Sequence, residues 1–175
     1  MMRSEPERVK RVVELPTDIA TLAEIATAEG WAHLERLVAD WHAGTNRFNR
    51  PGEGLFEARA AEGSLIGLCG LNRDPHAAAG ESAGRVRRMY VLPAWRGRGV
   101  GSQLLAHVEQ AAGATFTMLV LRTHDPAAAA FYAAHGFAPV QDNAHRTHAK
   151  ALAPARRPSR SGGRRWSSRR RSSPR

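Results

Sequence analysis

Residues 92–105, LPAWRGRGVGSQLL, place three glycines directly before a run of residues with the apolar spacing of a helix. The residues before this stretch, VRRMYVL at 86–92, alternate as a strand does, and the residues from Val100 to Val108 place apolar side chains on one helix face. A strand that turns through glycines into a helix presents free N–H groups together with the positive end of the helix dipole. The stretch therefore predicts an anion site.

The glycines of this turn leave its backbone open to a ligand. Gly97, Gly99 and Gly101 carry no Cβ atom that would block close approach, and Arg96 and Arg98 can add positive charge. We expect a pyrophosphate as the ligand. A P-loop would require Gly-Lys-Ser/Thr, and the sequence has GVGSQ instead.

Two other interpretations of the glycines stay open at this point. A dinucleotide fingerprint would require a glycine where Ser102 stands, and an acidic residue after the next strand. A glycine-rich turn that binds nothing is the other possibility. The glycines alone do not decide between them.

Two motifs carry a resemblance to a known family. RRMYVLPAWRGRGVGSQLL at 87–105 resembles the GNAT superfamily of acyl-CoA N-acyltransferases, whose pyrophosphate loop reads Arg/Gln-x-x-Gly-x-Gly/Ala. HDPAAAAFYAAHGF at 124–137 is similar to the family's helix that carries an Asn and, seven residues later, a Tyr before a Gly-Phe pair. The positions that match these motifs are Arg96, Gly99, Gly101, Asp125, Tyr132, Gly136 and Phe137. The resemblance covers about residues 10–150.

The resemblance implies acetyl-CoA as the cofactor. It implies that the main chain of Met89, Tyr90 and Val91 pairs with the pantetheine arm and polarises the thioester carbonyl. It also implies that the loop cradles the pyrophosphate, and the residues of the loop are Arg96, Gly97, Arg98, Gly99, Val100, Gly101 and Ser102.

The implied reaction is the direct attack of a primary amine on acetyl-CoA in a ternary complex. By its position in the family, Tyr132 donates a proton or hydrogen bond to the departing thiolate; an aromatic that only packs in an alanine-rich helix is the alternative. Asp125 stands where the family often has an Asn that contacts the cofactor. An aspartate cannot donate as the amide does, so helix capping is an alternative role for it.

The usual catalytic base is absent. Many relatives carry a glutamate where this sequence has Val120 or Arg85. The residues considered as substitutes are Glu53, Glu57, His33 and His124, and the sequence assigns none of them as the base. This absence leaves open a second function, that of a sensor that binds acyl-CoA without turnover.

The expected fold class is α/β, with a mixed, mostly antiparallel central sheet flanked by helices. The chain order is a strand, two helices, three strands, a helix, a strand, a helix and two closing strands. The expected strands lie at 11–15, 86–92, 115–121, 137–140 and 145–152, with a hairpin over 55–71. The expected helices lie at 19–30, 31–44, 100–113 and 126–136.

Charge divides the chain into a domain, 1–152, and a tail, 153–175. The formal net charge is +10, but the tail holds nine arginines and no acid, so the domain carries only +1. Arg, Ser, Pro and Gly dominate the tail, which predicts disorder. A nucleic-acid-binding protein that acts through this tail is therefore an alternative function, and a tail without any function is the other interpretation that stays open.

Other features bound the location and the ligands. Cys69 is the only cysteine and is expected in the core, no run of apolar residues would span a membrane, and the N-terminus lacks the apolar region of a signal peptide. A cytoplasmic protein is expected. His145 and His148, three apart in an expected strand, face opposite sides, and no metal is predicted.

The acceptor is expected to be a small amine of unknown identity. The tandem helices and the loops at 46–54 and 72–84 would select it. The acidic residues Glu24, Glu35, Asp40 and Glu53 lie in this region and would attract a cation unless they are ordinary surface acids. A homodimer is possible, since related proteins often dimerise.

Overall fold

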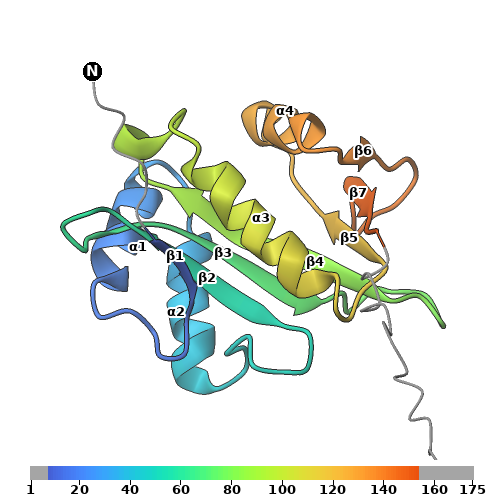
Figure 1. Ribbon diagram of the computed structural model, residues 1–175, viewed down its shortest axis with the longest axis horizontal. Helices are drawn as coiled ribbons and strands as arrows, with labels where there is room; N and C mark the ends of the chain where they lie inside the picture. The colour runs from blue at the N-terminus through green and yellow to red at the C-terminus, as the bar shows by residue number, and fades with distance from the viewer. Residues whose placement is uncertain (1–7, 154–175) are drawn as a thin grey trace, which may run out of the picture.

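The computed structural model describes residues 8–153, which form one seven-stranded sheet with helices on both faces (Figure 1). The strands are β1 Arg8–Arg11, β2 Gly54–Arg59, β3 Leu65–Arg73, β4 Ala83–Val91, β5 Met118–Leu121, β6 Ala138–Pro139 and β7 His148–Ala151. The helices are α1 Ile19–Ala28, α2 His33–Ala43, the 3-10 turn η1 Pro93–Trp95, α3 Val100–Ala112 and α4 Pro126–Ala134.

The sheet is mixed and mostly antiparallel, as expected. Its strand order is β1-β2-β3-β4-β5-β7-β6. Only β4 and β5 run parallel, and the other neighbouring strands pair in the antiparallel sense. The parallel pair is joined by α3, which crosses one face of the sheet (Figure 1). The predicted fold class is therefore confirmed.

Two hydrophobic clusters hold the helices to the two faces. On one face, α3 and α4 pack against the sheet through a cluster that includes Leu104, Leu105, Tyr132 and Phe137. On the other face, α1 and α2 pack through Leu22, Leu34, Leu37 and their neighbours. The β3 strand lies between them and is buried along all but its last residue. Cys69 in this strand is fully buried, as predicted.

Helix ends follow the local sequence signals. Asp125 accepts a hydrogen bond from the N–H of Ala128 at 3.1 Å, and Pro126 occupies the first turn of α4. Gly44 ends α2 in the left-handed conformation at a φ of +75°, which a residue without a Cβ adopts at low cost. These ends agree with the predicted helices.

The first strand differs from the prediction in its position. We predicted a strand at 11–15, but β1 ends at Arg11, and beyond it only the N–H of Val12 donates to the carbonyl of Leu55. Val13 is 85% exposed, so its strand-like side chain has no sheet to pack on. Pairing with β2, which is non-local, fixes where this strand lies.

β4 contains a bulge that changes which side chains share a face. The pairing with β3 shifts between Leu68 and Gly70, and Arg88 has a φ of +58°. As a result Arg87 and Arg88 both face α2, while Met89 faces α3. The bulge lies in the segment that the sequence assigns to the thioester.

Candidate active site

β4 and β5 separate after a short parallel pairing. They pair only from Ala83 with Met118 to Arg85 with Val120. β4 continues for six more residues to Val91, and the edge of this part that faces away from β3 has no strand partner within residues 8–153. The main chain of Met89, Tyr90 and Val91, the predicted thioester segment, lies along this open edge.

The open edge leads into the glycine loop. After η1, Gly97 and Gly99 have φ values of +71° and +85°, and Gly99 is the N-cap of α3. A Cβ atom at either glycine would meet no atom within 4 Å, so backbone conformation rather than crowding requires glycine here.

The amides at the start of α3 are available to a ligand. No side chain caps the helix, and the N–H of Gln103 makes the first helical bond, to the carbonyl of Gly99. The N–H groups of Val100, Gly101 and Ser102 therefore have no partner within the helix. Together with the helix dipole, they suit a pyrophosphate, so the predicted loop fits the predicted ligand.

Arg96 is held by α1 rather than directed at the loop amides. Its guanidinium donates to both carboxylate oxygens of Glu29, at 2.8 and 2.9 Å, and its Nε donates to the carbonyl of Val91. The Tyr90 hydroxyl also donates to Glu29. The hydrogen bonds from Arg96 and Tyr90 lower the pKa of Glu29. This arrangement ties the loop to the end of α1.

Ser102 links α3 to α4. Its hydroxyl lies 2.9 Å from Nε2 of His135, and Nδ1 of His135 lies 2.7 Å from the carbonyl of Phe131. A carbonyl only accepts, so Nδ1 carries the proton and, in the neutral ring, Nε2 accepts the hydrogen bond from Ser102. Arg98, by contrast, lies over the Trp95 ring, 5.3 Å from its centroid.

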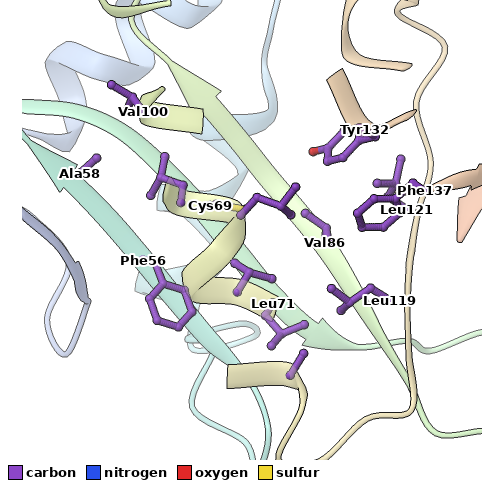
Figure 2. Close-up of a cluster of buried hydrophobic side chains, with 14 of the residues drawn as sticks. Phe56, Ala58, Cys69, Leu71, Val86, Val100, Leu119, Leu121, Tyr132 and Phe137 are labelled. Atoms are coloured by element: carbon purple, nitrogen blue, oxygen red, sulfur yellow. The ribbon is translucent and has the colours of Figure 1, made fainter. Parts of the chain in front are cut away.

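Tyr132 lies on the buried side of α4. It is 6% exposed, and its ring packs edge-on against Phe131 and Phe137. Its hydroxyl points from α4 towards β4, away from Phe137 (Figure 2). Burial, and to a smaller extent Cys69, raise the pKa of Tyr132, so its hydroxyl keeps its proton.

Asp125 has a structural role in this arrangement. Its carboxylate caps α4, as described above, and its N–H donates to the hydroxyl of Thr123 at 3.2 Å. The capping alternative is therefore realised. A contact of Asp125 with the cofactor stays a prediction.

The two positions where relatives carry a glutamate face each other across the parallel pair. Arg85 and Val120 are register partners, and both are buried. Arg85 donates to the buried carboxylate of Asp74, which also binds Arg146. Arg146 in turn binds Glu81 and lowers the pKa of Glu81 to about 2. No catalytic carboxylate comes from the usual positions.

The alternative bases differ in their surroundings. Glu57 is bound by Lys10 and Arg59, and His124 is exposed in the segment before α4. Glu53 is buried and accepts the N–H of Arg73 at 3.0 Å. None of these three lies on β4 or on a helix that packs against it.

His33 is the alternative base that lies beside the open strand. It begins α2, its ring contacts the main chain of Met89, and its Nε2 atom is buried without a hydrogen-bond partner in the described part of the chain. Burial, and next the charge of Arg88, lower the pKa of His33 below 6.5. The ring is therefore neutral at neutral pH, with a nitrogen free to accept a proton.

Several residues of this site were not anticipated. The contacts Glu29–Arg96, Ser102–His135 and Asp74–Arg146 join segments 33 to 72 residues apart. Neither local spacing nor the two motifs contains information on such pairs. Only the charge of each residue, without its partner, is visible in the sequence.

Two further findings concern ligands and membranes. Among residues 8–153, no group of three or more His, Cys, Asp or Glu side chains is arranged to hold a metal ion. His145 stacks on His76 with ring centroids 3.8 Å apart, and His148 is buried in β7. Within the same range, no helix has the length and apolar character to cross a membrane.

Comparisons with known proteins agree with the two sequence motifs. A family model described as an acetyltransferase (GNAT) domain matches residues 52–139. The fold is similar to that of a candidate acetyltransferase from Exiguobacterium sp. 255-15, with 26% identity, a TM-score of 0.73 and coverage of 82% of this chain and 92% of that one.

Two other solved structures share the fold at lower identity. One is an acetyltransferase of the GNAT family from Staphylococcus aureus Mu50, with 16% identity, a TM-score of 0.65 and coverage of 83% and 100%. The other is a GNAT family N-acetyltransferase from Escherichia coli in complex with CoA, with 18% identity, a TM-score of 0.62 and coverage of 83% and 81%. A comparison with curated proteins found no match. The family model spans half of the sequence, and the chain therefore belongs to the GNAT family of acetyltransferases.

Proposed function

We propose that the protein is an N-acetyltransferase that moves an acetyl group from acetyl-CoA to a primary amine. The observation that carries this proposal is the open edge of β4, which runs directly into the uncapped N-terminus of α3. A long ligand with an amide-containing arm and a pyrophosphate matches this spatial order of groups, in which main-chain donors and acceptors on β4 are followed by the free amides of α3. The CoA complex of the Escherichia coli relative supports the same ligand class.

The chain's own groups account for binding. The amides of Val100, Gly101 and Ser102 would hold the pyrophosphate, and the main chain from Met89 to Val91 would hold the pantetheine arm. When bound, acetyl-CoA supplies an activated acetyl group. Main-chain donors fixed on β4 stabilise negative charge on a carbonyl oxygen without reorganisation.

Tyr132 is the proposed proton donor. A departing thiolate has a pKa of about 8.5, so a hydroxyl that retains its proton can donate to it. Burial holds Tyr132 protonated, and the hydroxyl faces β4 (Figure 2).

His33 is the proposed proton acceptor. A primary amine has a pKa of about 10 and must lose a proton before it attacks. The buried Nε2 of His33 lacks a partner, and the ring touches Met89 on the side of the sheet opposite α3. This nitrogen lies beside the thioester segment, and an amine that approaches from the α2 side would have to displace the atoms that bury it before the proton is transferred.

The pH dependence of the reaction tests His33. Its lowered pKa predicts that kcat/KM rises with pH and shows an inflection below pH 6.5, where the ring becomes neutral. In His33→Gln, kcat/KM above this pH should fall and the inflection should disappear. An unchanged pH profile would remove His33 from the mechanism.

Stability gives a second test of the pKa of His33. The folded-state pKa lies below 6.5, so the contribution of this ring to stability falls as the pH drops below 6.5. The unfolding temperature of His33→Gln should lack this pH-dependent decrease.

The glycine loop is tested by a pair of matched substitutions. Gly99→Ala forces an L-residue to a φ of +85°, which costs roughly 1–2 kcal/mol and is relieved by moving the loop amides. We expect the Kd for acetyl-CoA to rise about tenfold, measured by calorimetry, for a loss of roughly 1.4 kcal/mol. Gly63→Ala is the control, since Gly63 has a φ of +94° and equally open surroundings in the turn between β2 and β3. Equal Kd values for the two variants would contradict the loop assignment.

The activity itself is tested by release of free thiol from acetyl-CoA in the presence of amines. Binding without any turnover would favour the sensor. Of the tail predicted at 153–175, residues 154–175 lie outside the described residues. Nucleic-acid binding by the tail stays a prediction, as do a cytoplasmic location and a homodimer.

A further inference from the structure

A cavity of about 320 Å³ lies on the α2 face of the sheet, beside the bulge of β4. This volume is at the small end of the range of about 300–1,000 Å³ found for ligand sites. The end of α2, the loop after it and the end of β3 line the cavity. Its charged lining residues are Arg47, Arg50, Arg73, Arg87, Asp40 and Glu53. Arginines therefore outnumber carboxylates.

Both carboxylates of this cavity already have partners. Asp40 forms an ion pair with Arg88 at 3.3 Å and accepts the hydroxyl of Thr45. Glu53 is 5% exposed and accepts the N–H of Arg73 at 3.0 Å. A cationic group in the cavity would therefore compete with existing contacts.

Arg87 is the half-buried cation of the cavity; Arg47, Arg50 and Arg73 likewise form no ion pair within residues 8–153, but their side chains are exposed. None of the ion pairs formed within residues 8–153 includes Arg87, although its side chain is half-buried. Burial, and next the charge of Arg85, lower the pKa of Arg87. A guanidinium still keeps its charge at neutral pH, and a half-buried charge without a paired carboxylate is costly, although Asp74, Asp40 and Glu53 lie near enough to attract it. A bound anion would remove this cost.

Arg87 links the cavity to the segment of β4 that would hold the thioester. Arg87 precedes Met89 of the thioester segment by two residues, and the bulge turns Arg87 and Arg88 to the same side. The same face carries His33 at the start of α2. The loops that line the cavity, at 44–53 and 72–75, fall within or beside the loops expected to select the acceptor.

We propose that this cavity binds the carboxylate of the acceptor, with Arg87 as its main ligand, so that the substrates are amino acids or other amines that carry a carboxylate. The guanidinium fork matches the two oxygens of a carboxylate. Asp40 and Glu53 disfavour a dianion such as a phosphate ester in the same place. That the bound anion belongs to the acceptor rests on the proposed acetyltransferase function.

Another cavity, of about 510 Å³, lies near the end of α3 and β7, and it offers no comparable group. Its lysine, Lys150, is paired with Glu109 at 2.7 Å, and alanines make up much of the rest of its lining. It lies away from the open edge of β4. Of these two cavities, the arginine-lined one is suited to an acceptor.

Matched acceptors and matched variants test the proposal. The acceptors are glycine, β-alanine, γ-aminobutyrate, leucine and phenylalanine, each compared with its primary amide, which keeps the amine and loses the negative charge. In Arg87→Gln, we expect KM for the best carboxylate to rise at least tenfold with kcat little changed, while KM for its amide and for acetyl-CoA stays the same. Arg36→Gln, on the exposed side of α2, makes the same change in charge and should affect neither acceptor.

A binding measurement separates this proposal from the proposed function. The wild-type protein, saturated with CoA, is titrated calorimetrically with the same carboxylates and amides. Binding of a carboxylate that is lost in Arg87→Gln supports the cavity even if no thiol is ever released, in which case only the acetyltransferase function fails. Equal affinity for carboxylates and amides, no saturation by any carboxylate, or equal binding by wild type and Arg87→Gln would overturn the proposal.

Discussion

Replacing Tyr132 with phenylalanine is expected to lower kcat about 100-fold, the lower end of what a positioned proton donor contributes. The ring of Tyr132 packs against Phe131 and Phe137, and phenylalanine preserves these contacts. Only the hydroxyl that faces β4 is lost. The departing thiolate would then leave without a protein donor, and steady-state thiol release at saturating acetyl-CoA measures the effect.

Two controls make this result specific. The Kd for acetyl-CoA and the unfolding temperature of Tyr132→Phe should stay close to those of the wild type, because the buried ring remains. The raised pKa of Tyr132 also predicts that its ionisation does not shape the rate profile at neutral pH. Equal kcat in the two proteins would leave Tyr132 with packing as its only role.

Removing the carboxylate of Asp74 is expected to destabilise the protein strongly. Its side chain is fully buried and pairs with Arg85 and Arg146, each at 2.9 Å, whose side chains are 7% and 9% exposed. Breaking a buried ion pair from one side costs about 3–5 kcal/mol, since the other charge stays buried without a partner. We expect a loss in this range for Asp74→Ala by urea unfolding.

Glu24→Gln is a suitable control for this loss, since it removes a carboxylate from the exposed surface of α1 and should leave stability unchanged. A loss of less than 1 kcal/mol in Asp74→Ala would contradict the importance of the pair.

Glu81 makes the stability of the protein depend on pH. Its pKa is lowered from 4.5 to about 2, so its contribution is complete above pH 4.5 and is lost as the pH falls towards 2.

Local signals predicted most of the fold. The spacing of apolar residues and the signals at the ends of the helices placed α1 to α4, and the order of elements placed the strands that they join. The error at β1 arose where Val12 and Val13 have strong strand propensity, but only the N–H of Val12 reaches β2 and Val13 is left exposed. Propensity is local, whereas pairing depends on β2, more than 40 residues away.

The glycine loop and the strand before it could be located from the sequence, because backbone amides need no particular side chain. Their interpretation as a cofactor site came from the two-motif resemblance and stays a prediction. Contacts between distant side chains could not be located from the sequence. Arg96 was expected at the pyrophosphate, but Glu29, 67 residues away, holds it in the structure. The bulge at Arg88 was equally hidden, since a positive φ there has no glycine to indicate it.

The bulge in β4 also constrains how this protein can change over evolutionary time. Substitutions that straightened β4 without changing its length would exchange the sides on which Arg87 and everything before it emerge, relative to Tyr90, whereas deleting one of the two arginines at the bulge would keep those sides. In the straightened strand, Arg87 would lie on the same side of the sheet as α3, and Val86 would leave the core on that side. The left-handed conformation at Arg88 should therefore be maintained, or be lost together with one residue between Val86 and Met89, so that Val86 and Tyr90 keep their sides.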